Sequence, residues 1–226
     1  MKDSTNISFE MSGRENSPFH VSIEGNIGSG KSSVLAFFKK FEEFECNPEP
    51  VQKWRNFQGH NLLELMYREP SNNTFAFQIA VQLSRYNELA RFSGKEVRFF
   101  ERTLDSSKFV FSELAHKEGN LADHELAIIN AWFEQLKQSL PPIGLYIYLR
   151  TSPQIAIERI RKRGRPEESN LDVEFVTKLH DLHEQWMVQE QYGPLGAKLL
   201  TIDADRSQEE VMDQLLANME IIKGLK

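Results

Sequence analysis

The chain has 226 residues, of which 40% are apolar and 27% are charged, so its composition is that of an ordinary globular protein. The formal net charge is −6, which excludes a general attraction to nucleic acid or to anionic membranes. Cys46 is the only cysteine, which excludes an intramolecular disulfide, and no run of about 18 apolar residues that could span a membrane occurs.

Residues 1–17 are polar and aperiodic, and we expect them to form a flexible tail. They include three acidic residues, whereas mitochondrial presequences are rich in arginine and poor in acids. We therefore expect a cytoplasmic protein, or a mitochondrial one if a presequence has been removed. Residues 18–226 are enough for one domain with a full core and too few for two, so we predict a single domain.

Short β-type runs alternate with amphipathic helical patterns along this domain. The predicted strands are residues 19–24, 45–48, 97–101, 144–150 and 198–204. The predicted helices are residues 31–44, 61–68, 74–92, 104–117, a helix with Asp123 as its N-cap, 153–163, a helix around 175–186, and 207–222. This alternation predicts an α/β fold, a five-stranded parallel sheet with helices on both faces. Ligands of such sheets bind beyond the carboxyl ends of the strands.

The first strand runs into a segment that matches the pattern G-x-x-x-x-G-K-[ST] in full, Gly25 to Ser32. Its backbone N–H groups and the following helix N-terminus favour anionic oxygens, so we predict a P-loop that binds a nucleoside triphosphate. We expect Lys31 to reach the β- and γ-phosphates and the hydroxyl of Ser32 to bind Mg²⁺. The predicted donor-binding residues of this segment are Gly25, Asn26, Ile27, Gly28, Ser29, Gly30, Lys31, Ser32 and Ser33.

Two carboxylates follow later strands. Glu49 lies between two prolines after the second predicted strand, and Glu101 ends the third, next to Arg102. A carboxylate at the edge of the sheet can accept a proton from a hydroxyl that attacks a phosphate, and it can also bind Mg²⁺. The alternatives are an exposed loop glutamate at position 49 and a structural ion pair between Glu101 and Arg102.

An arginine-rich segment, R-I-R-K-R-G-R-P-E-E, follows the fourth strand. Arg159, Arg163 and Arg165 lie around a glycine and a proline, the composition of a lid that closes over phosphates. The alternative is a solvated basic patch. His180 and His183 have a spacing that suggests a metal pair, but we attribute them to an exposed helix face.

Together these segments resemble the deoxynucleoside kinases. The motifs that carry the resemblance are EGNIGSGKS (24–32), EPVQKWRN (49–56), NLLELMY (61–67), FAFQ (75–78), ERT (101–103), IYLRTSP (147–153) and ERIRKRGRPEE (158–168). The resemblance implies a P-loop kinase fold with an Arg-rich lid. It also implies ATP- and Mg²⁺-dependent phosphorylation of the 5′-hydroxyl of deoxynucleosides, with pyrimidines favoured over purines. A homodimer and feedback inhibition by a deoxynucleoside triphosphate are further implications.

The resemblance also implies roles for individual residues. Glu49 would be the base that activates the 5′-hydroxyl and Glu101 the carboxylate on the magnesium side, although the reverse assignment stays open. Tyr67 and Glu168 would hold the 3′-hydroxyl, and Arg102 the 5′-oxygen. Gln78 would bind the edge of the nucleobase, with Trp54, Phe77 and Phe111 around its ring. Asp205 and Arg206 would lie near the adenine of ATP.

The residues that tune base choice depart from any one member of the family. Val81 resembles the thymidine-accepting kinases, whereas Arg85 resembles those that accept deoxycytidine and purines, in which an Asp stands at the position of Ser107. We expect Arg85 to turn to solvent or to pair with Asp105. Two other functions stay open: a thymidylate-type monophosphate kinase, and a nucleotide-binding switch or module.

Overall fold

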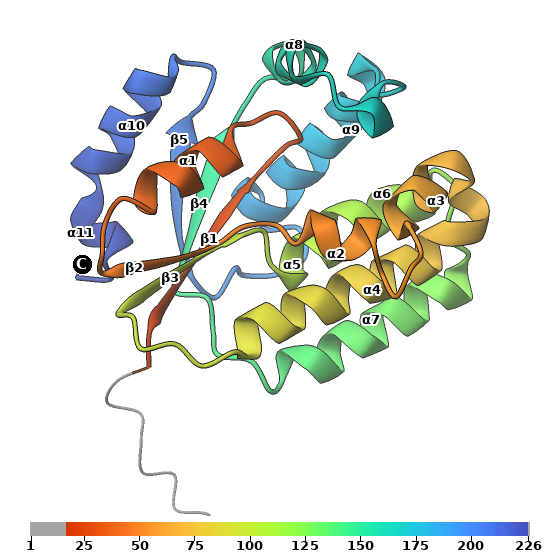
Figure 1. Ribbon diagram of the computed structural model, residues 1–226, viewed down its shortest axis with the longest axis horizontal. Helices are drawn as coiled ribbons and strands as arrows, with labels where there is room; N and C mark the ends of the chain where they lie inside the picture. Colours follow the sequence, from red (N-terminus) through yellow and green to blue (C-terminus); the bar gives the residue numbers. More distant parts are fainter. Residues whose placement is uncertain (1–16, 226) are drawn as a thin grey trace, which may run out of the picture.

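The computed structural model describes residues 17–225, without the side chain of Glu167. Its centre is a five-stranded parallel sheet with the order β2-β3-β1-β4-β5, visible in Figure 1. The strands are β1 (Phe19–Gly25), β2 (Phe44–Asn47), β3 (Val97–Glu101), β4 (Leu145–Arg150) and β5 (Lys198–Asp203). The predicted sheet is confirmed, and each strand lies within one residue of its predicted bounds. The predicted tail, apart from residue 17, lies outside the described residues.

The strand order brings the predicted functional segments to one edge of the sheet. β1 is the central strand, and its Ile23 pairs with Glu101 of β3 while Gly25 pairs with Leu149 of β4. Because all strands are parallel, the segments that follow β1, β2, β3 and β4 leave the sheet on the same side.

Three helices cover one face of the sheet: α1 (Lys31–Phe38), α10 (Gln208–Ala217) and α11 (Met219–Ile222), as Figure 1 shows. Phe38 stacks on Phe99 of β3 with 4.4 Å between ring centroids. The predicted helix 31–44 is wrong beyond residue 38. Phe41 and Phe44 have helical spacing in the sequence, but they reach the same aromatic cluster from a turn and from β2. The predicted helix 207–222 is divided at Asn218.

The other face packs against a second set of helices, α4 (Pro70–Ala90), α6 (Glu113–Lys117), α7 (Asp123–Lys137) and α9 (Val173–His183). Residues 104–117 are helical as predicted, but in three parts: α5 (Leu104–Ser106), a wide π turn η1 (Ser107–Ser112) and α6. Asp123 is not the N-cap of α7. Ala122 occupies that position, and the side chain of Glu125 accepts its backbone N–H at 2.9 Å.

Four of the remaining helical segments lie at the edge of the sheet where ligands are expected: α2 (Val51–Arg55), α3 (Leu62–Arg68), α8 (Pro153–Arg163) and a 3₁₀ turn η2 (Pro166–Glu168). A π turn, η3 (Glu184–Val188), continues α9 and packs in the core of the second face. α2 was not predicted, and α4 begins four residues earlier than expected, with Pro70 at its first position. None of the described helices is both long and apolar enough to cross a membrane.

Candidate active site

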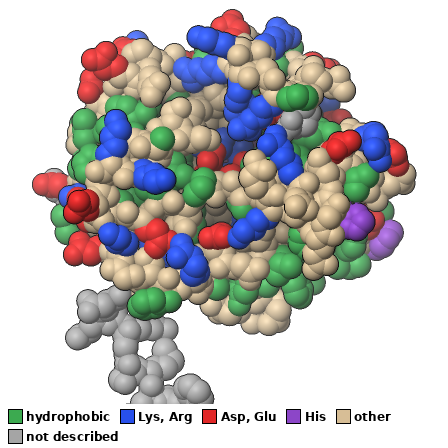
Figure 2. Space-filling model, in the orientation of Figure 1, with side chains coloured by type: hydrophobic (Ala, Val, Ile, Leu, Met, Phe, Trp, Pro, Cys, Tyr) green, Lys and Arg blue, Asp and Glu red, His purple; other side chains and the backbone are tan. Residues whose placement is uncertain are grey.

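A cavity of about 490 Å³ opens beyond the carboxyl ends of the strands, a size typical of small-molecule sites. Figure 2 shows Lys and Arg side chains around this hollow and acidic side chains deeper inside it. The predicted site residues that line the cavity are Ile27, Gly28, Lys31, Ser32, Glu49, Trp54, Tyr67, Phe77, Gln78, Val81, Arg85, Glu101, Arg102, Phe111, Arg163, Arg165 and Glu168. The fold therefore gathers residues from most of the length of the chain into one space.

The P-loop connects β1 to α1 and needs its glycines. Gly28 has φ +81°, and a Cβ there would lie 2.5 Å from the carbonyl oxygen of Ala156, a clash that only glycine avoids. Lys31 is buried, and its Nζ donates to the carbonyl oxygens of Asn26 at 2.6 Å and Gly25 at 3.1 Å. Burial, helped by the charge of Arg102, lowers the pKa of Lys31 to about 7. Burial thus disfavours the charged ammonium of Lys31, and an anionic ligand bound at the loop would restore it.

Ser32 and Glu101 lie together at the start of α1 and the end of β3. The hydroxyl of Ser32 donates to Oε1 of Glu101 at 2.8 Å. Hydroxyl and carboxylate oxygens are the hard ligands that Mg²⁺ prefers. Among the described residues no cluster of three or more His, Cys, Asp or Glu side chains could hold a metal. The Ser32–Glu101 pair fits an ion that takes few ligands from protein and the rest from phosphates and water.

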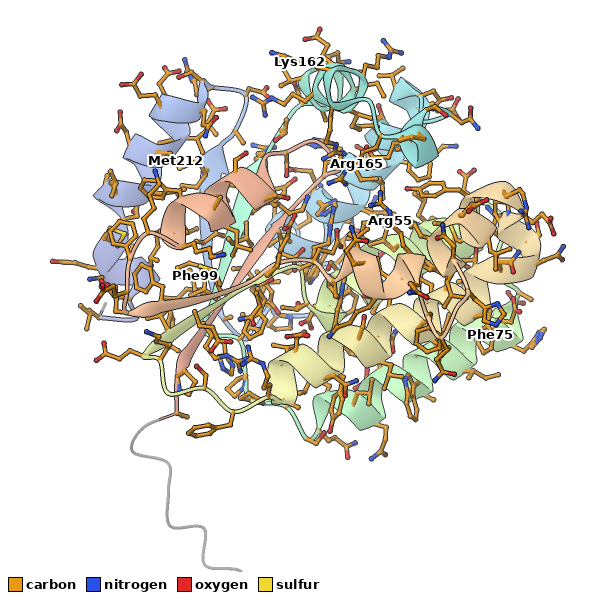
Figure 3. The ribbon with its side chains drawn as sticks, in the orientation of Figure 1. Arg55, Phe75, Phe99, Lys162, Arg165 and Met212 are labelled. Carbon is orange, nitrogen blue, oxygen red and sulfur yellow. The ribbon has the colours of Figure 1, made fainter. Side chains whose placement is uncertain are left out.

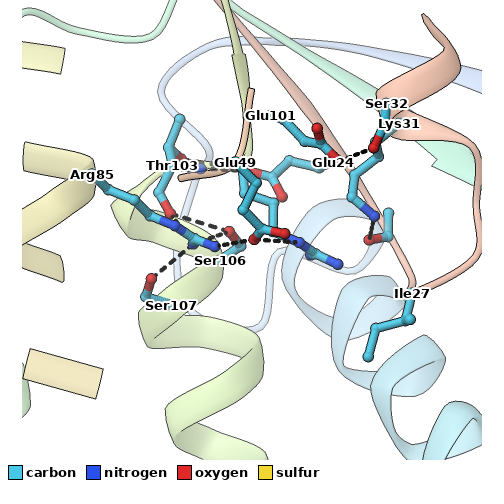
Figure 4. Close-up of polar contacts among 12 residues, drawn as sticks. Glu24, Ile27, Lys31, Ser32, Glu49, Arg85, Glu101, Thr103, Ser106 and Ser107 are labelled. Carbon is cyan, nitrogen blue, oxygen red and sulfur yellow. Dashed lines mark hydrogen bonds and ion pairs between the residues drawn. The ribbon is translucent and has the colours of Figure 1, made fainter. Parts of the chain in front are cut away.

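Glu49 lines the cavity and contacts two arginines, and Figure 4 shows its bond to Arg85. Its Oε1 is 2.7 Å from Nη2 of Arg85 and 3.5 Å from Nε of Arg102. Burial raises the pKa of Glu49, but the charges of Arg102, Arg85 and Lys31 outweigh burial and hold that pKa below its usual range. Glu49 is therefore an ionised carboxylate facing the cavity, not an exposed loop residue; its side chain is 22% exposed.

The partner of Arg85 differs from the prediction. The guanidinium is 4% exposed and bonds Glu49, so it neither turns to solvent nor pairs with Asp105. Asp105 instead binds Nζ of Lys137 at 2.7 Å. Ser107, where the resemblance implies an Asp, accepts from Nη1 of Arg85 at 2.8 Å. Because the hydroxyl of Ser107 is neutral, the carboxylate of Glu49 is the group that balances the positive charge of Arg85.

The side of the cavity toward α4 is aromatic and apolar. Trp54 and Phe77 are nearly perpendicular, with ring centroids 5.7 Å apart, and Val81 lies one turn after Phe77 on α4. Gln78 is 5% exposed, lines the cavity, and its Oε1 accepts no hydrogen bond from any described residue. An amide with an open acceptor among aromatic rings can bind the edge of a planar ring while the aromatics pack against its faces.

Two of the three predicted lid arginines share one carboxylate. Arg163 lies 2.5 Å from Oε2 of Glu168, and Arg165 lies 3.3 Å from Oε1. Figure 3 shows Arg165 facing Arg55 of α2 across the mouth of the cavity. Arg159 does not line the cavity. It donates to the carbonyl oxygens of Ala204 at 2.8 Å and Arg206 at 3.2 Å, and so holds the loop after β5.

Other predicted donor-side residues lie beside the cavity without lining it. Asp205 accepts the backbone N–H of Ser152 at 2.8 Å, and Arg206 binds Asp203 at 2.9 Å. The remaining predicted site residues that do not line the cavity are Gly25, Asn26, Ser29, Gly30, Ser33 and Ser107. The first five belong to the loop or helix that shapes the phosphate side.

Glu24 is a buried acid behind the site that the sequence did not single out. It is fully buried at the end of β1, where its Oε1 accepts from Ser22 Oγ at 2.7 Å and from the backbone N–H of Thr103 at 3.2 Å. Burial raises its pKa. Thr103 follows Arg102, whose φ of +68° is unusual for a residue with a side chain. The only sequence signal was an acid at the end of a predicted strand.

The position of His183 differs from the prediction of an exposed helix face. It is fully buried, with its Nδ1 2.6 Å from the carbonyl oxygen of Leu179 and its ring stacked on Tyr148, so the exposed-face interpretation is wrong for this residue. Burial lowers the pKa of His183 well below its usual range.

A parallel sheet with a P-loop after its central strand, and with a paired carboxylate opposite that loop, defines a phosphotransferase of the P-loop class. The family model for deoxynucleoside kinase matches residues 21–222. Human mitochondrial thymidine kinase 2 is 34% identical, over 89% of this chain and 77% of that protein. Chicken deoxycytidine kinase 2 is 37% identical, over 87% and 86%, and bovine deoxycytidine kinase is 32% identical, over 88% and 89%.

The chain belongs to the deoxynucleoside kinase family. It is an enzyme of nucleoside salvage that phosphorylates deoxynucleosides, and the kinase family implies ATP as the donor. The predicted function is confirmed at this level, and it takes the place of the two alternatives, a monophosphate kinase and a switch.

Proposed function

We propose that the enzyme transfers the γ-phosphoryl group of ATP to the 5′-hydroxyl of pyrimidine deoxynucleosides, thymidine and deoxycytidine, and more slowly to purine deoxynucleosides. The observation that carries this proposal is the position of Glu49. It lines the same cavity as the P-loop residues Lys31 and Ser32 and as the amide of Gln78. A carboxylate between a phosphate-binding loop and an amide that binds the nucleobase is in position to accept the proton of the sugar hydroxyl.

In this proposal Glu49 accepts the proton of the 5′-hydroxyl as that oxygen attacks the γ-phosphorus. Arg85 and Arg102 both contact Oε1, and we assign the proton to the other carboxylate oxygen, Oε2. Arg102, which also lies over the ring of Phe111 at 4.7 Å, supplies positive charge beside the reacting oxygen. Proton transfer to a positioned carboxylate typically contributes about 10²–10⁴-fold.

On the donor side, Lys31 and the P-loop amides bind the β- and γ-phosphates. Mg²⁺, held by Ser32 and Glu101, would neutralise charge on the phosphate oxygens when it is bound. Arg163 and Arg165 stabilise the transferring phosphoryl group from the lid, while Asp205 and Arg206 lie on the adenine side. Arg159 contributes by fixing the loop after β5, because its guanidinium is bound to backbone carbonyls there.

On the acceptor side, Tyr67 and Glu168 bind the 3′-hydroxyl and Gln78 binds the base edge. Trp54, Phe77 and Phe111 pack on the base, and Val81 leaves room for its substituent. The amide of Gln78 offers both a donor and an acceptor, which suits thymine as well as cytosine.

We extend the proposal to a homodimer formed through α4 and α7. Leu83, Ile128 and Trp132 of these packed helices are 38%, 50% and 39% exposed, an apolar surface that a second copy would cover. A deoxynucleoside triphosphate end product would inhibit by occupying both substrate sites. The proposed location stays cytoplasmic, with mitochondria as the alternative.

Replacing Glu49 by Gln tests the central assignment. The amide keeps the size of the side chain but cannot accept the proton, so kcat should fall by about 10²–10⁴-fold while thymidine binding is largely kept. Turnover with thymidine, deoxycytidine, deoxyadenosine, deoxyguanosine and thymidine monophosphate should be measured against ATP consumption without acceptor. A Glu49→Gln enzyme that turns over at the wild-type rate would refute the assignment.

A further inference from the structure

Arg85 joins four segments around the candidate active site. It lies on α4, two turns after Gln78, and its guanidinium is buried. Nη1 donates to the carbonyl oxygen of Thr103 at 2.7 Å and to the hydroxyls of Ser106 at 3.1 Å and Ser107 at 2.8 Å. Nη2 donates to Glu49 at 2.7 Å. Figure 4 shows these bonds converging from the β2–α2 loop, the end of β3 and η1.

The hydrogen-bond count leaves this guanidinium little capacity to bind a nucleobase. A guanidinium has five N–H groups. Nη1 already faces three acceptors and Nη2 holds a carboxylate, while Nε is buried away from the cavity surface without a partner among the described residues. Gln78 also lines the cavity, and its Oε1 accepts from no described residue. The group that is open to the base is therefore the amide, and the group committed to the scaffold is the arginine.

Glu49 needs a partner that fixes its carboxylate. Its backbone is restricted by Pro48 and Pro50, but the side chain can still rotate. Arg85 is anchored to Thr103, Ser106 and Ser107, so it offers Nη2 at a fixed point. The bond from Nη2 to Oε1 fixes the position of one carboxylate oxygen of a residue that lines the cavity.

We propose that Arg85 is a positioning residue for the proton-accepting Glu49, and that it acts on turnover with every nucleoside instead of selecting the base. The inference rests on the proposed function of Glu49. Arg85 shares a helix with Gln78 and Val81, which would suggest a role in binding the base. The inference instead assigns Arg85 a part in proton transfer. Base choice is then left to the residues whose polar or apolar surface is free in the cavity.

The test compares Arg85→Met and Arg85→Lys with Lys53→Met, using kcat and KM for thymidine, deoxycytidine, deoxyadenosine and deoxyguanosine. Lys53 is a matched control, because it lies on neighbouring α2 and pairs with Glu88 of α4 without lining the cavity. Arg85→Met should lower kcat about 10-fold to 100-fold, a large part of what a general base contributes, and by a similar factor for every nucleoside. KM should change less than about threefold.

Arg85→Lys keeps the charge but cannot span Thr103 and Glu49 with one planar group. It should therefore lose less turnover than Arg85→Met, again equally for the four nucleosides, and it serves as the test if the Met variant does not fold. Lys53→Met should match the wild type. Arg85 variants with unchanged kcat, or with KM changes confined to some bases, would overturn the inference in favour of base selection.

A double-mutant cycle separates the inference from the proposal beneath it. In a Glu49→Gln background, Arg85→Met should lower kcat little further, because the group that it positions is gone. If the same factor is lost in both backgrounds, Arg85 acts independently of Glu49 and the inference is wrong although the base assignment stands. If Glu49→Gln alone keeps wild-type turnover, the base assignment fails and the inference falls with it.

Discussion

Replacing Gln78 by Leu should weaken substrate binding and stabilise the free enzyme at the same time. The two side chains have similar size, so the change removes the amide without opening a large cavity. Gln78 is 5% exposed, and Oε1 has no hydrogen-bond partner among residues 17–225. In the free protein this acceptor is costly, whereas in the proposed complex it receives a hydrogen bond from the base.

Both effects can be given a size. A buried polar group without a partner costs about 1–3 kcal/mol, and at this chain length about 1 kcal/mol shifts the melting temperature by about 2–4 °C. The free Gln78→Leu protein should therefore melt several degrees higher. Two neutral hydrogen bonds to the base are worth about 1 kcal/mol each, so kcat/KM for thymidine should fall about 30-fold.

The assay is thermal unfolding of the free protein together with steady-state kinetics, and Gln82→Leu is the control. Gln82 follows Gln78 by one turn of α4, is fully buried with no described partner for either side-chain polar atom, and does not line the cavity. Its replacement should also raise the melting temperature but leave the kinetics unchanged. A Gln78→Leu enzyme with a lower melting temperature and an unchanged kcat/KM would mean that the amide supports the fold and does not bind the base.

Two further predictions concern carboxylates of the site. Glu168→Gln removes the charge that holds Arg163 and Arg165. The value of kcat/KM for thymidine should fall about 10-fold to 100-fold, and kcat/KM for a 3′-deoxy analogue should fall less. An equal fall for both substrates would refute the contact of Glu168 with the 3′-hydroxyl. Neighbouring arginines hold the pKa of Glu49 below its usual range, so the acid limb of kcat/KM should lie below the range of an ordinary glutamate. The stability gained from this ionised carboxylate should be lost only as pH falls through that lowered pKa. An acid limb within or above the ordinary glutamate range would contradict this prediction.

Local patterns were enough to predict the sheet and the P-loop. Most of the strands are short runs rich in apolar residues, and the P-loop is contiguous in sequence, so its structure follows from neighbouring residues. Helix ends were less predictable, because apolar spacing does not reveal which element carries the residue. Phe41 and Phe44 continue the helical period of α1 yet pack on Phe38 and Phe99 from outside it.

The acceptor side depends on contacts between residues that are distant in the sequence. The sequence indicated which residues belong to this side of the site but not which of them pair with each other. Glu49 and Arg85 are 36 positions apart, and no local pattern links them. Asp105 was the nearest acid in sequence, but Lys137 from α7 occupies it. Glu24 was overlooked because an acid at a strand end has no periodic signal, although its bond to Thr103 supports the strained backbone at Arg102.

Position 107 connects base choice to proton transfer in this chain. A carboxylate there would lie within reach of Nη1 of Arg85, since the hydroxyl of Ser107 is already 2.8 Å away, and it would compete with Glu49 for the positive charge. With serine at this position, Glu49 is the only carboxylate among the described residues that pairs with Arg85. In the proposed mechanism, the combination of Arg85 with Ser107 is therefore no incomplete version of a base-selecting pair. It places the arginine on the proposed proton-accepting carboxylate, which predicts that Ser107→Asp lowers kcat even though every other residue of the candidate site is unchanged.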